Sequence, residues 1–429
     1  MTPPASLARS AFDAASANVL TVGVEEEFLL VDLDDDVLAP VTHEVIEALS
    51  PDETFRHELR AAQIEAVTPV CTTVGAVERH LIDARSRLVQ AASEAARVLA
   101  APVFPGPAST GPATAERRYL DILLDAPWAS HSLLACGMHV HVAVGDADRA
   151  VALHDRLRSY LPLLGALAAN SPVYDGVDAA VASARAHLNQ SLARFGSPPA
   201  FGSWNNFAAF MRWGAAGGVI ADPSYHWYGL RLNPLHGTVE VRVFDVQTDV
   251  TRAAALAALT QSLAAWLLQR IDDGMSVPVH DHHRIQESLW LAARDGAETL
   301  LPALDTGLLM PVEVQLAQLI DNLRPHAEAL GCAHHLDSVV RLQQLPGHEQ
   351  QRRVFRDSGL RHLIDWLTLK NQPENGDFSI RQQRDMKPSV ALVAAGRANG
   401  SPMGSPARSE AMSYAAPRKD ANGDASVRP

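Results

Sequence analysis

The chain has 429 residues, of which 47% are hydrophobic and 20% charged, and its formal net charge is -13. These values are typical of a folded protein large enough to bury a sizeable core, and they exclude a chain that is disordered throughout. No run of lysine and arginine is long enough to follow a phosphate backbone, so we do not expect nucleic acid as a partner.

The first half of the body alternates strand-like and helix-like segments. Residues 19–32 are rich in β-branched and aromatic side chains and precede an acidic turn, and residues 63–70 form a shorter extended run. Apolar residues recur at helical spacing over 76–100, which predicts a helix. A further strand is predicted over 133–144, followed by a helix over 152–172 that ends at an asparagine and a proline.

The second half continues in the same way. Residues 236–247 predict another strand, 253–270 a long apolar helix, and 360–370 the last ordered helix. The segments alternate without a strict βαβ rhythm. We therefore expect an α+β fold in which helices cover one face of a largely antiparallel sheet.

The composition changes at both ends of the chain. Residues 1–17 are small and polar, and we expect a flexible N-terminal arm there. Beyond residue 370 aromatic residues nearly vanish, while serine, proline, glycine and alanine dominate, which predicts a disordered tail over 371–429. No linker or internal repeat divides residues 18–370, so we expect a single catalytic domain between the two ends.

The cysteines and the apolar segments bear on the compartment. The three cysteines, Cys71, Cys136 and Cys332, lie far apart without a C-x-x-C pair, which favours a reducing compartment over a thiolate zinc site. The first twenty residues lack the apolar core of a secretory signal. The apolar run 253–270 is shorter than the roughly 20 residues that cross a bilayer. We therefore expect a cytoplasmic protein that does not bind membranes.

Ionisable side chains occupy alternate positions in four of the extended segments. Because side chains alternate along a strand, Glu25 and Glu27 share one face while Glu26 takes the other. The same spacing pairs further residues on single faces: Gln63 with Glu65, His139 with His141, and Glu240 with Arg242. Taken alone, the glutamate-containing segments are also compatible with solvated edge strands, and the histidines with core residues. Glu240 and Arg242 are compatible with an ion pair on a solvent-exposed face.

Together, the four segments predict a sheet with one face under helices and the other forming the floor of a cleft. Two carboxylates ~4 Å apart repel each other by about 1 kcal/mol in water and about 4 kcal/mol at a protein surface. A divalent cation removes this cost, and oxygen-rich ligation favours Mg²⁺ or Mn²⁺ over zinc. Mg²⁺ on carboxylates commonly holds the phosphates of ATP. Residues 106–111 have the glycine spacing of a P-loop, but Pro112 stands in place of the lysine.

The chain resembles the bacterial carboxylate–amine ligases of the glutamate–cysteine ligase type 2 family, which are relatives of glutamate–cysteine ligase and glutamine synthetase. The resemblance spans residues 18–370 and rests on six segments: GVEEEFLLVD, QIEAVTPVC, GMHVHVAV, ANSPVYDG, GSPPAFGSWNNF and GTVEVRVFDV. It implies a sheet curled into a cup that binds ATP and Mg²⁺, with helices on its outer face, and a homodimer.

The resemblance also implies roles for individual residues. Carried over position by position, the metal ligands are Glu25, Glu27, Glu65, His139 and Glu240. The residues implied to bind ATP are Glu25, Glu27, Glu240 and Arg242. Arg231, Arg242 and Glu65 are implied to be catalytic, and the two arginines suit charge that develops during phosphoryl transfer. Whether His141 is a ligand stays open.

One helix departs from the family pattern. The family reads close to E-N-R-W-R-A-A-R-x-G, whereas this chain has Ser288, Leu289 and Leu291 at the asparagine and the first two arginines. The acceptor amine is therefore left open. The loop 196–207, which contains two prolines and Trp204, is a candidate lid.

The resemblance implies an ATP-dependent ligase that joins glutamate or another carboxylic acid to cysteine or another amine. The reaction would pass through an acyl phosphate, with weak glutamate–cysteine ligase activity. Two other functions stay open. His139 and His141 could hold zinc in a metal-dependent hydrolase, although a third histidine in a comparable context is missing. The chain could also be a non-catalytic sensor that binds an amino acid or a nucleotide.

Overall fold

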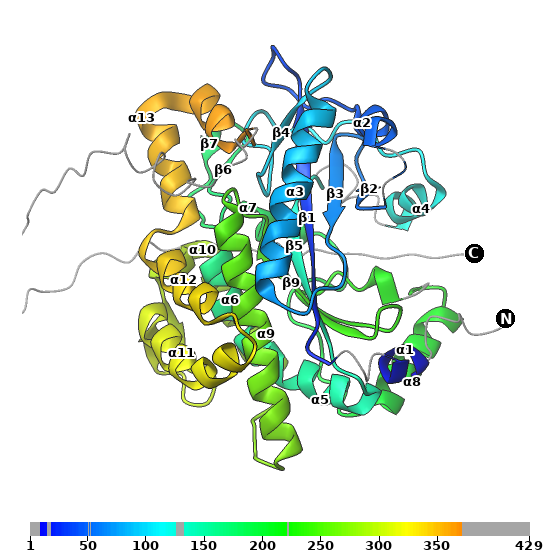
Figure 1. Ribbon diagram of the computed structural model, residues 1–429, viewed down its shortest axis with the longest axis vertical. Helices are drawn as coiled ribbons and strands as arrows, with labels where there is room; N and C mark the ends of the chain where they lie inside the picture. Colours follow the sequence, from blue (N-terminus) through cyan, green and yellow to red (C-terminus); the bar gives the residue numbers. More distant parts are fainter. Residues whose placement is uncertain are drawn as a thin grey trace, which may run out of the picture. The chain divides into compact units, whose positions relative to one another are not determined.

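The computed structural model describes residues 9–14, 19–49, 51, 53–125, 133–220 and 223–370 (Figure 1). The tail expected over 371–429 lies outside this range, as does most of the expected arm. The described part of the arm forms α1 (Ser10–Ala14). Its Phe12 is fully buried, and the Phe12 and Trp204 rings meet edge to face with their centroids 5.5 Å apart. This part of the arm therefore packs against the folded body.

An antiparallel sheet forms the centre of the molecule. In the described part of the chain it runs in the order β2 (Phe55–His57), β3 (Gln63–Val67), β1 (Val22–Val31), β5 (Gly137–Ala143), β9 (Thr238–Asp245) and β8 (Leu230–Asn233). β4 (Arg97–Leu99) also pairs with β1. The edge strands β2 and β8 do not pair with each other, so the sheet is open. Two short hairpins lie outside it: β6 (Val173–Tyr174) with β7 (Val177–Asp178), and β10 (Leu300–Pro302) with β11 (Leu309–Pro311).

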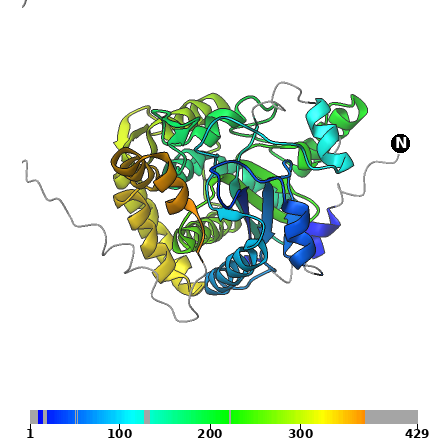
Figure 2. The ribbon, with the colours of Figure 1, turned by 90° about the horizontal axis from the view of Figure 1, so that it is seen from above.

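Helices surround the sheet. Those of the first half are α2 (Thr42–Leu49), α3 (Val74–Ala92), α4 (Arg117–Asp125), α5 (Ala147–Leu157), α6 (Leu161–Ala168) and α7 (Ala184–Asn189). Those of the second half are α8 (Trp204–Ala216), α9 (Val250–Asp272), α10 (His282–Asp295), α11 (Val312–Ala329), α12 (Ala333–Gln344) and α13 (Gly347–Leu367). Figures 1 and 2 show α11, α12 and α13 on the side of the molecule opposite α4. The expected α+β fold is confirmed.

The apolar helix α9 is the central helix of the core. Nearly every residue from Ala253 to Leu268 is buried. Asp249 precedes the helix, and its carboxylate accepts a hydrogen bond from the backbone N–H of Thr251, which satisfies one unpaired donor of the first turn. No helix in the described ranges is long and apolar enough to cross a membrane.

Two predicted helices differ from the structure. The helix expected over 76–100 ends at Ala92, because residues 97–99 instead form β4 and pair with β1. Their apolar side chains fit helical spacing and strand burial equally well, so periodicity alone did not separate the two. The helix expected over 152–172 starts earlier, where Asp146 caps α5, and it breaks into α5, a 3-10 turn and α6.

Candidate active site

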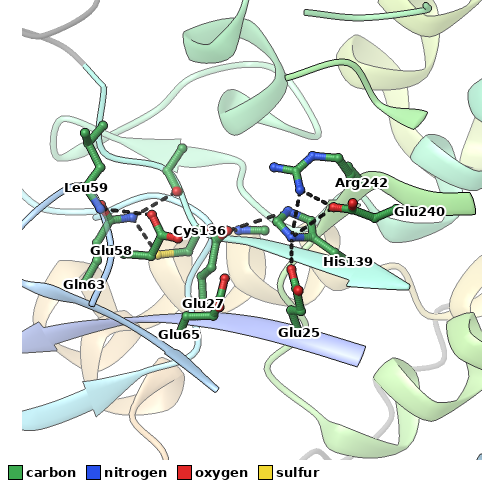
Figure 3. A network of polar contacts seen from close by, with 12 residues as sticks. Glu25, Glu27, Glu58, Leu59, Gln63, Glu65, Cys136, His139, Glu240 and Arg242 are labelled. Atoms are coloured by element: carbon green, nitrogen blue, oxygen red, sulfur yellow. Dashed lines mark hydrogen bonds and ion pairs between the residues drawn. The ribbon is translucent and has the colours of Figure 1, made fainter. Parts of the chain in front are cut away.

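Strand register gathers the predicted site residues on one face of the sheet (Figure 3). The cross-strand neighbours are Glu27 with Glu65, Glu25 with His139, His141 with Glu240, and Arg231 with Glu240. Directly opposed residues on one face have side chains close enough to interact. Arg242 lies two residues from Glu240 on the same strand. All the residues singled out from the sequence, His141 included, therefore converge on one site.

Glu25 connects the two histidines. One of its carboxylate oxygens lies 2.9 Å from His139 Nδ1, and the other lies 3.2 Å from His141 Nε2. Burial alone would raise the pKa of Glu25, but His141 and His139 hold it well below its usual range. Burial and the nearby Arg242 lower the pKa of His139 to about 4. Burial would also lower the pKa of His141, but the charges of Glu240 and Glu25 raise it. His139 is therefore a neutral imidazole at physiological pH.

Glu240 is enclosed by cationic and amide donors. It is fully buried, and Arg231 binds it through two hydrogen bonds of 2.8 Å from Nε and Nη2. The Asn233 amide donates a third hydrogen bond of 3.0 Å, and Arg242 Nη1 donates a fourth. Burial would raise the pKa of Glu240, but Arg231, Arg242 and His141 keep it well below its usual range. This carboxylate is ionised and compensated.

A second group of acids has little cationic compensation. Glu27, Glu58 and Glu65 each have a carboxylate oxygen within 4.8 Å of the others. Burial and the charge of Glu58 raise the pKa of Glu27 to about 8. Burial, reinforced by the neighbouring acids, raises the pKa of Glu65 well above its usual range, and burial raises that of Glu58. Among the described residues, the Glu27 carboxylate accepts one hydrogen bond, from the backbone N–H of Gly137 at 2.6 Å.

Glu58 was missed from the sequence. It lies one residue beyond the short edge strand β2, which the sequence did not predict, and it has no alternating acidic partner. Only the fold places it beside Glu27 and Glu65. Arg185 was missed for a similar reason. It lies on the short helix α7, with its Nη1 3.6 Å from Asp245 and its guanidinium lining the same cavity as Glu27.

A cavity of about 590 Å³ lies over these residues. Its floor carries Glu25, Glu27, Glu65, His139, Arg231 and Arg242, and its walls add Glu58, Arg56, Arg118 and Arg185. Further wall residues are apolar: Leu59, Leu133, Ala135, Leu192, Phe195 and Trp227. The volume is in the range of small-molecule sites, and the converging charged groups are the feature expected of an active site.

Three overlapping sets of side chains in the cavity could hold divalent cations. They are Glu25, Glu65 and His139; Glu25, His141 and Glu240; and Glu27, Glu58 and Glu65. Within each set the donor atoms lie within 4.8 Å of one another. The pKa values of Glu27, Glu58 and Glu65 are raised because burial outweighs the nearby arginines, of which Arg56 lies 3.8 Å from Glu65. Carboxylate-rich sets with few nitrogen donors suit Mg²⁺ or Mn²⁺, so the residues present fit these ions.

Two further segments singled out from the sequence lie outside the cavity lining, the loop 196–207 and the helix α10. The candidate lid over 196–207 packs into the core, where Phe201, Trp204 and Phe207 are buried and Asp155 accepts hydrogen bonds from the backbone of Phe201 and Gly202. These contacts anchor the segment in the core, and its role as a lid stays a prediction.

The helix that departs from the family pattern is α10. None of Ser288, Leu289 and Leu291 is among the described residues that line the cavity, and Ser288 is buried. The departure therefore does not alter the described walls of the cavity directly.

Comparison with known proteins gives a family match over most of the chain. The model of glutamate-cysteine ligase family 2 matches residues 21–381. "Putative glutamate--cysteine ligase 2-1" of Rubrobacter xylanophilus is 34% identical over 352 residues, which cover 79% of this chain and 91% of that protein. "Putative glutamate--cysteine ligase 2" of Thermobifida fusca is 33% identical over 363 residues, which cover 81% of this chain and 90% of that protein.

Solved structures show the same fold at low identity. Glutamate–cysteine ligase of Francisella tularensis, crystallised in complex with AMP, aligns with a TM-score of 0.60 and 14% identity, over 81% of this chain and 87% of that one. A bifunctional glutathione synthetase of Pasteurella multocida also reaches a TM-score of 0.60, at 13% identity, over 83% of this chain and 53% of that one.

Proposed function

This chain belongs to glutamate-cysteine ligase family 2 and is a carboxylate–amine ligase, and from this premise we propose that it forms an amide bond at the expense of ATP through an acyl phosphate. One observation carries the proposal: the carboxylates of Glu25, Glu27, Glu58 and Glu65 line a single cavity together with Arg231 and Arg242, and the buried Glu240 pairs with both arginines. Such a site suits transfer of a highly charged phosphoryl group, where catalysis is mainly positioning and charge stabilisation.

The residues proposed to hold Mg²⁺, or Mn²⁺ in its place, are Glu25, Glu27, Glu65, His139 and Glu240, with Glu58 as an addition from the structure. Bound there, divalent cations would neutralise the carboxylates and polarise phosphoryl oxygens. The neutral state of His139 supports this role, because an imidazolium cannot act as a ligand. His141 belongs to one of the three sets, so the geometry supports including it.

Arg231 and Arg242 are proposed to stabilise the transferred phosphoryl group. Glu240 fixes both guanidiniums, so their direction is set before substrate binds. Arg242 also lines the cavity, and its Nε has no hydrogen-bond partner among the described residues. Preorganised donors of this kind stabilise developing charge without a reorganisation cost during the reaction.

The proposed substrates are ATP, a carboxylic acid and an amine, with weak activity on glutamate and cysteine that gives γ-glutamylcysteine, ADP and phosphate. The family name of the chain and of its relatives supports this pair. We also propose that the chain is cytoplasmic and forms a homodimer. Light scattering of the purified chain would test the homodimer.

The deciding experiment is ADP release by purified protein with ATP and Mg²⁺, first with glutamate alone and then with cysteine added. Turnover that needs both an acid and an amine supports the ligase. ATP binding without turnover across a broad panel of acids and amines would instead indicate a sensor. Zinc retained through purification, together with hydrolytic activity, would indicate a hydrolase that uses His139 and His141.

A further inference from the structure

One wall of the cavity is apolar, in contrast to its floor. Six residues form it, and they are named here the apolar wall: Leu59, Leu133, Ala135, Leu192, Phe195 and Trp227. They pack together as a cluster of their own, and only Trp227 also contacts the larger core. All six line the cavity. A packed core cluster would face away from solvent on every side, so this cluster is placed to meet a ligand.

The apolar wall is held in place before any ligand binds. Arg60 Nε donates a 3.0 Å hydrogen bond to the carbonyl of Leu133, and the Gln63 amide donates one of 3.0 Å to the carbonyl of Ala135. The Arg194 guanidinium lies 5.3 Å from the centroid of the Trp227 ring. The surface is therefore preformed, and preorganisation of this kind lowers the cost of binding.

The apolar wall meets the carboxylate floor directly. Leu59 follows Glu58 in sequence, and its backbone N–H donates to the Glu58 carboxylate at 2.9 Å. Ala135 lies two residues before Gly137, whose N–H donates to Glu27. A small molecule whose reacting carboxylate or amine lies at Glu27 and Glu58 would therefore place its side chain against the apolar wall.

Glutamate matches this surface poorly. Besides the carboxylate that reacts, glutamate carries a second carboxylate, and burying a charge without a paired partner is costly. The apolar wall itself offers no cation to this carboxylate, and Arg56, Arg118 and Arg185 line other parts of the cavity. Arg194, behind Trp227, already donates hydrogen bonds to the carbonyls of Tyr225 and Val219. An aliphatic or aromatic side chain would instead remove apolar surface from water.

We propose that one of the two substrates is an amino acid with a leucine- to phenylalanine-sized apolar side chain, which binds against Leu192, Phe195 and Trp227. This inference rests on the proposed ligase function and names the substrate class of the same site. The adenine ring of ATP is a second apolar group that such a surface could hold, so the test must separate the two.

The test measures ADP release with ATP and Mg²⁺ over pairs in which the acid and then the amine is varied among leucine, phenylalanine, methionine, glutamate, glycine and cysteine. The best pair is expected to contain an apolar amino acid, with kcat/KM about tenfold or more above that for glutamate with cysteine. The position that prefers the apolar side chain, acid or amine, identifies which substrate the apolar wall holds.

Two variants of Leu192 assign the effect to the apolar wall. Leu192→Gln is expected to lower kcat/KM for the apolar substrate by about 10- to 100-fold and to leave the KM for ATP unchanged. Leu192→Ala enlarges the cavity and is expected to shift preference from leucine toward phenylalanine. Leu345→Gln, at an exposed leucine between α12 and α13, is the control and should change neither value. Thermal unfolding of each variant checks that the fold is intact.

Each outcome decides the matter. Glutamate with cysteine as the best pair overturns the inference and leaves the ligase function standing. A raised KM for ATP in Leu192→Gln assigns the apolar wall to adenine and also overturns it. Absence of ADP release with every pair rejects the proposed function instead. In that case calorimetry with leucine and phenylalanine decides, since binding that Leu192→Gln abolishes supports the apolar site and no binding overturns it.

Discussion

The acids of the site fall into two groups that differ in how their charge is accommodated. Glu25 and Glu240 have lowered pKa values because histidines and arginines outweigh the effect of burial. Glu27 and Glu65 have raised pKa values, because burial and neighbouring acids act in the same direction. Histidines and arginines of the protein compensate the negative charge of the first group, whereas the second group needs a bound cation or a proton to compensate its charge. The two groups should therefore respond oppositely to neutral substitution.

Glu65→Gln is expected to abolish ATP turnover while leaving the fold intact. The glutamine keeps the shape of a side chain whose ionised form burial disfavours, so metal-free stability should stay constant or rise slightly. Loss of one carboxylate from two of the three cation-binding sets should lower kcat by roughly 100-fold or more. ADP release measures the expected loss of turnover, and thermal unfolding measures the stability. Glu47→Gln, on the exposed face of α2, is the control, and full activity of Glu65→Gln would remove this residue from the mechanism.

Glu240→Gln is expected to destabilise the fold. The substitution leaves the largely buried side chains of Arg231 and Arg242 without the carboxylate that both bind, which typically costs about 3–5 kcal/mol. The free energy of unfolding in urea measures this cost. Replacing Arg231 by glutamine in the same chain should recover part of the loss, and this coupling separates the ion pair from a general packing defect. A loss below about 1 kcal/mol would show that solvent reaches the arginines.

The central strands are the elements in which sequence and structure agree best. Glu25, Glu27 and Glu65 could be placed on one face because alternation along a strand is a local property. Cross-strand register then fixed which residues meet, and the sequence does not contain that information directly. Glu58 and Arg185 lie on an edge-strand exit and on a short helix, where no periodic pattern marks them. Their position depends on the tertiary fold, so sequence reasoning did not find them.

The opposite face of the sheet is fixed by one buried ion pair. Glu26 points away from the site, and Arg85 of α3 binds both of its oxygens, at 2.9 and 2.5 Å. The same guanidinium donates to the carbonyls of Gln247 and Thr248, at 2.7 and 2.9 Å. Arg85 thus joins α3, β1 and the segment that leads into α9. This contact orients the helix layer relative to the catalytic floor.

Arg85→Met is expected to cost about 3–5 kcal/mol of stability, because it leaves the Glu26 charge buried and unpaired. The KM for ATP measured on the folded fraction should change little, since this pair lies on the face covered by helices. Combined replacement of Arg85 by methionine and Glu26 by glutamine should recover part of the lost stability. Urea unfolding and steady-state kinetics provide the two readouts. A large rise in the KM for ATP would show that the helix layer transmits strain to the site.

At the scale of the whole molecule, the metal-free protein is expected to lose stability as the pH rises from 6.5 to 8. The pKa of Glu27 rises from its usual value near 4.5 to about 8 on folding, so between these values the folded state binds a proton that the unfolded state has released. The free energy of unfolding therefore falls with rising pH in this window. The pKa values of Glu58 and Glu65 are also raised, so each group lowers stability as the pH rises above its usual value near 4.5. His139 acts oppositely, but only between its folded pKa of about 4 and its usual value of 6.5.

Mg²⁺ should remove this pH dependence if it binds the same carboxylates. One proton corresponds to about 1.4 kcal/mol per pH unit, so Glu27 alone contributes about 2 kcal/mol between pH 6.5 and 8. Urea unfolding at both pH values, with EDTA or with saturating Mg²⁺, measures the effect. Mg²⁺ is expected to stabilise the chain more at pH 8 than at pH 6.5, because at pH 6.5 it must displace protons. Glu27→Gln should reduce the slope of the metal-free profile, whereas a wild-type profile that is flat or rises with pH would contradict a carboxylate cluster that lacks its cation.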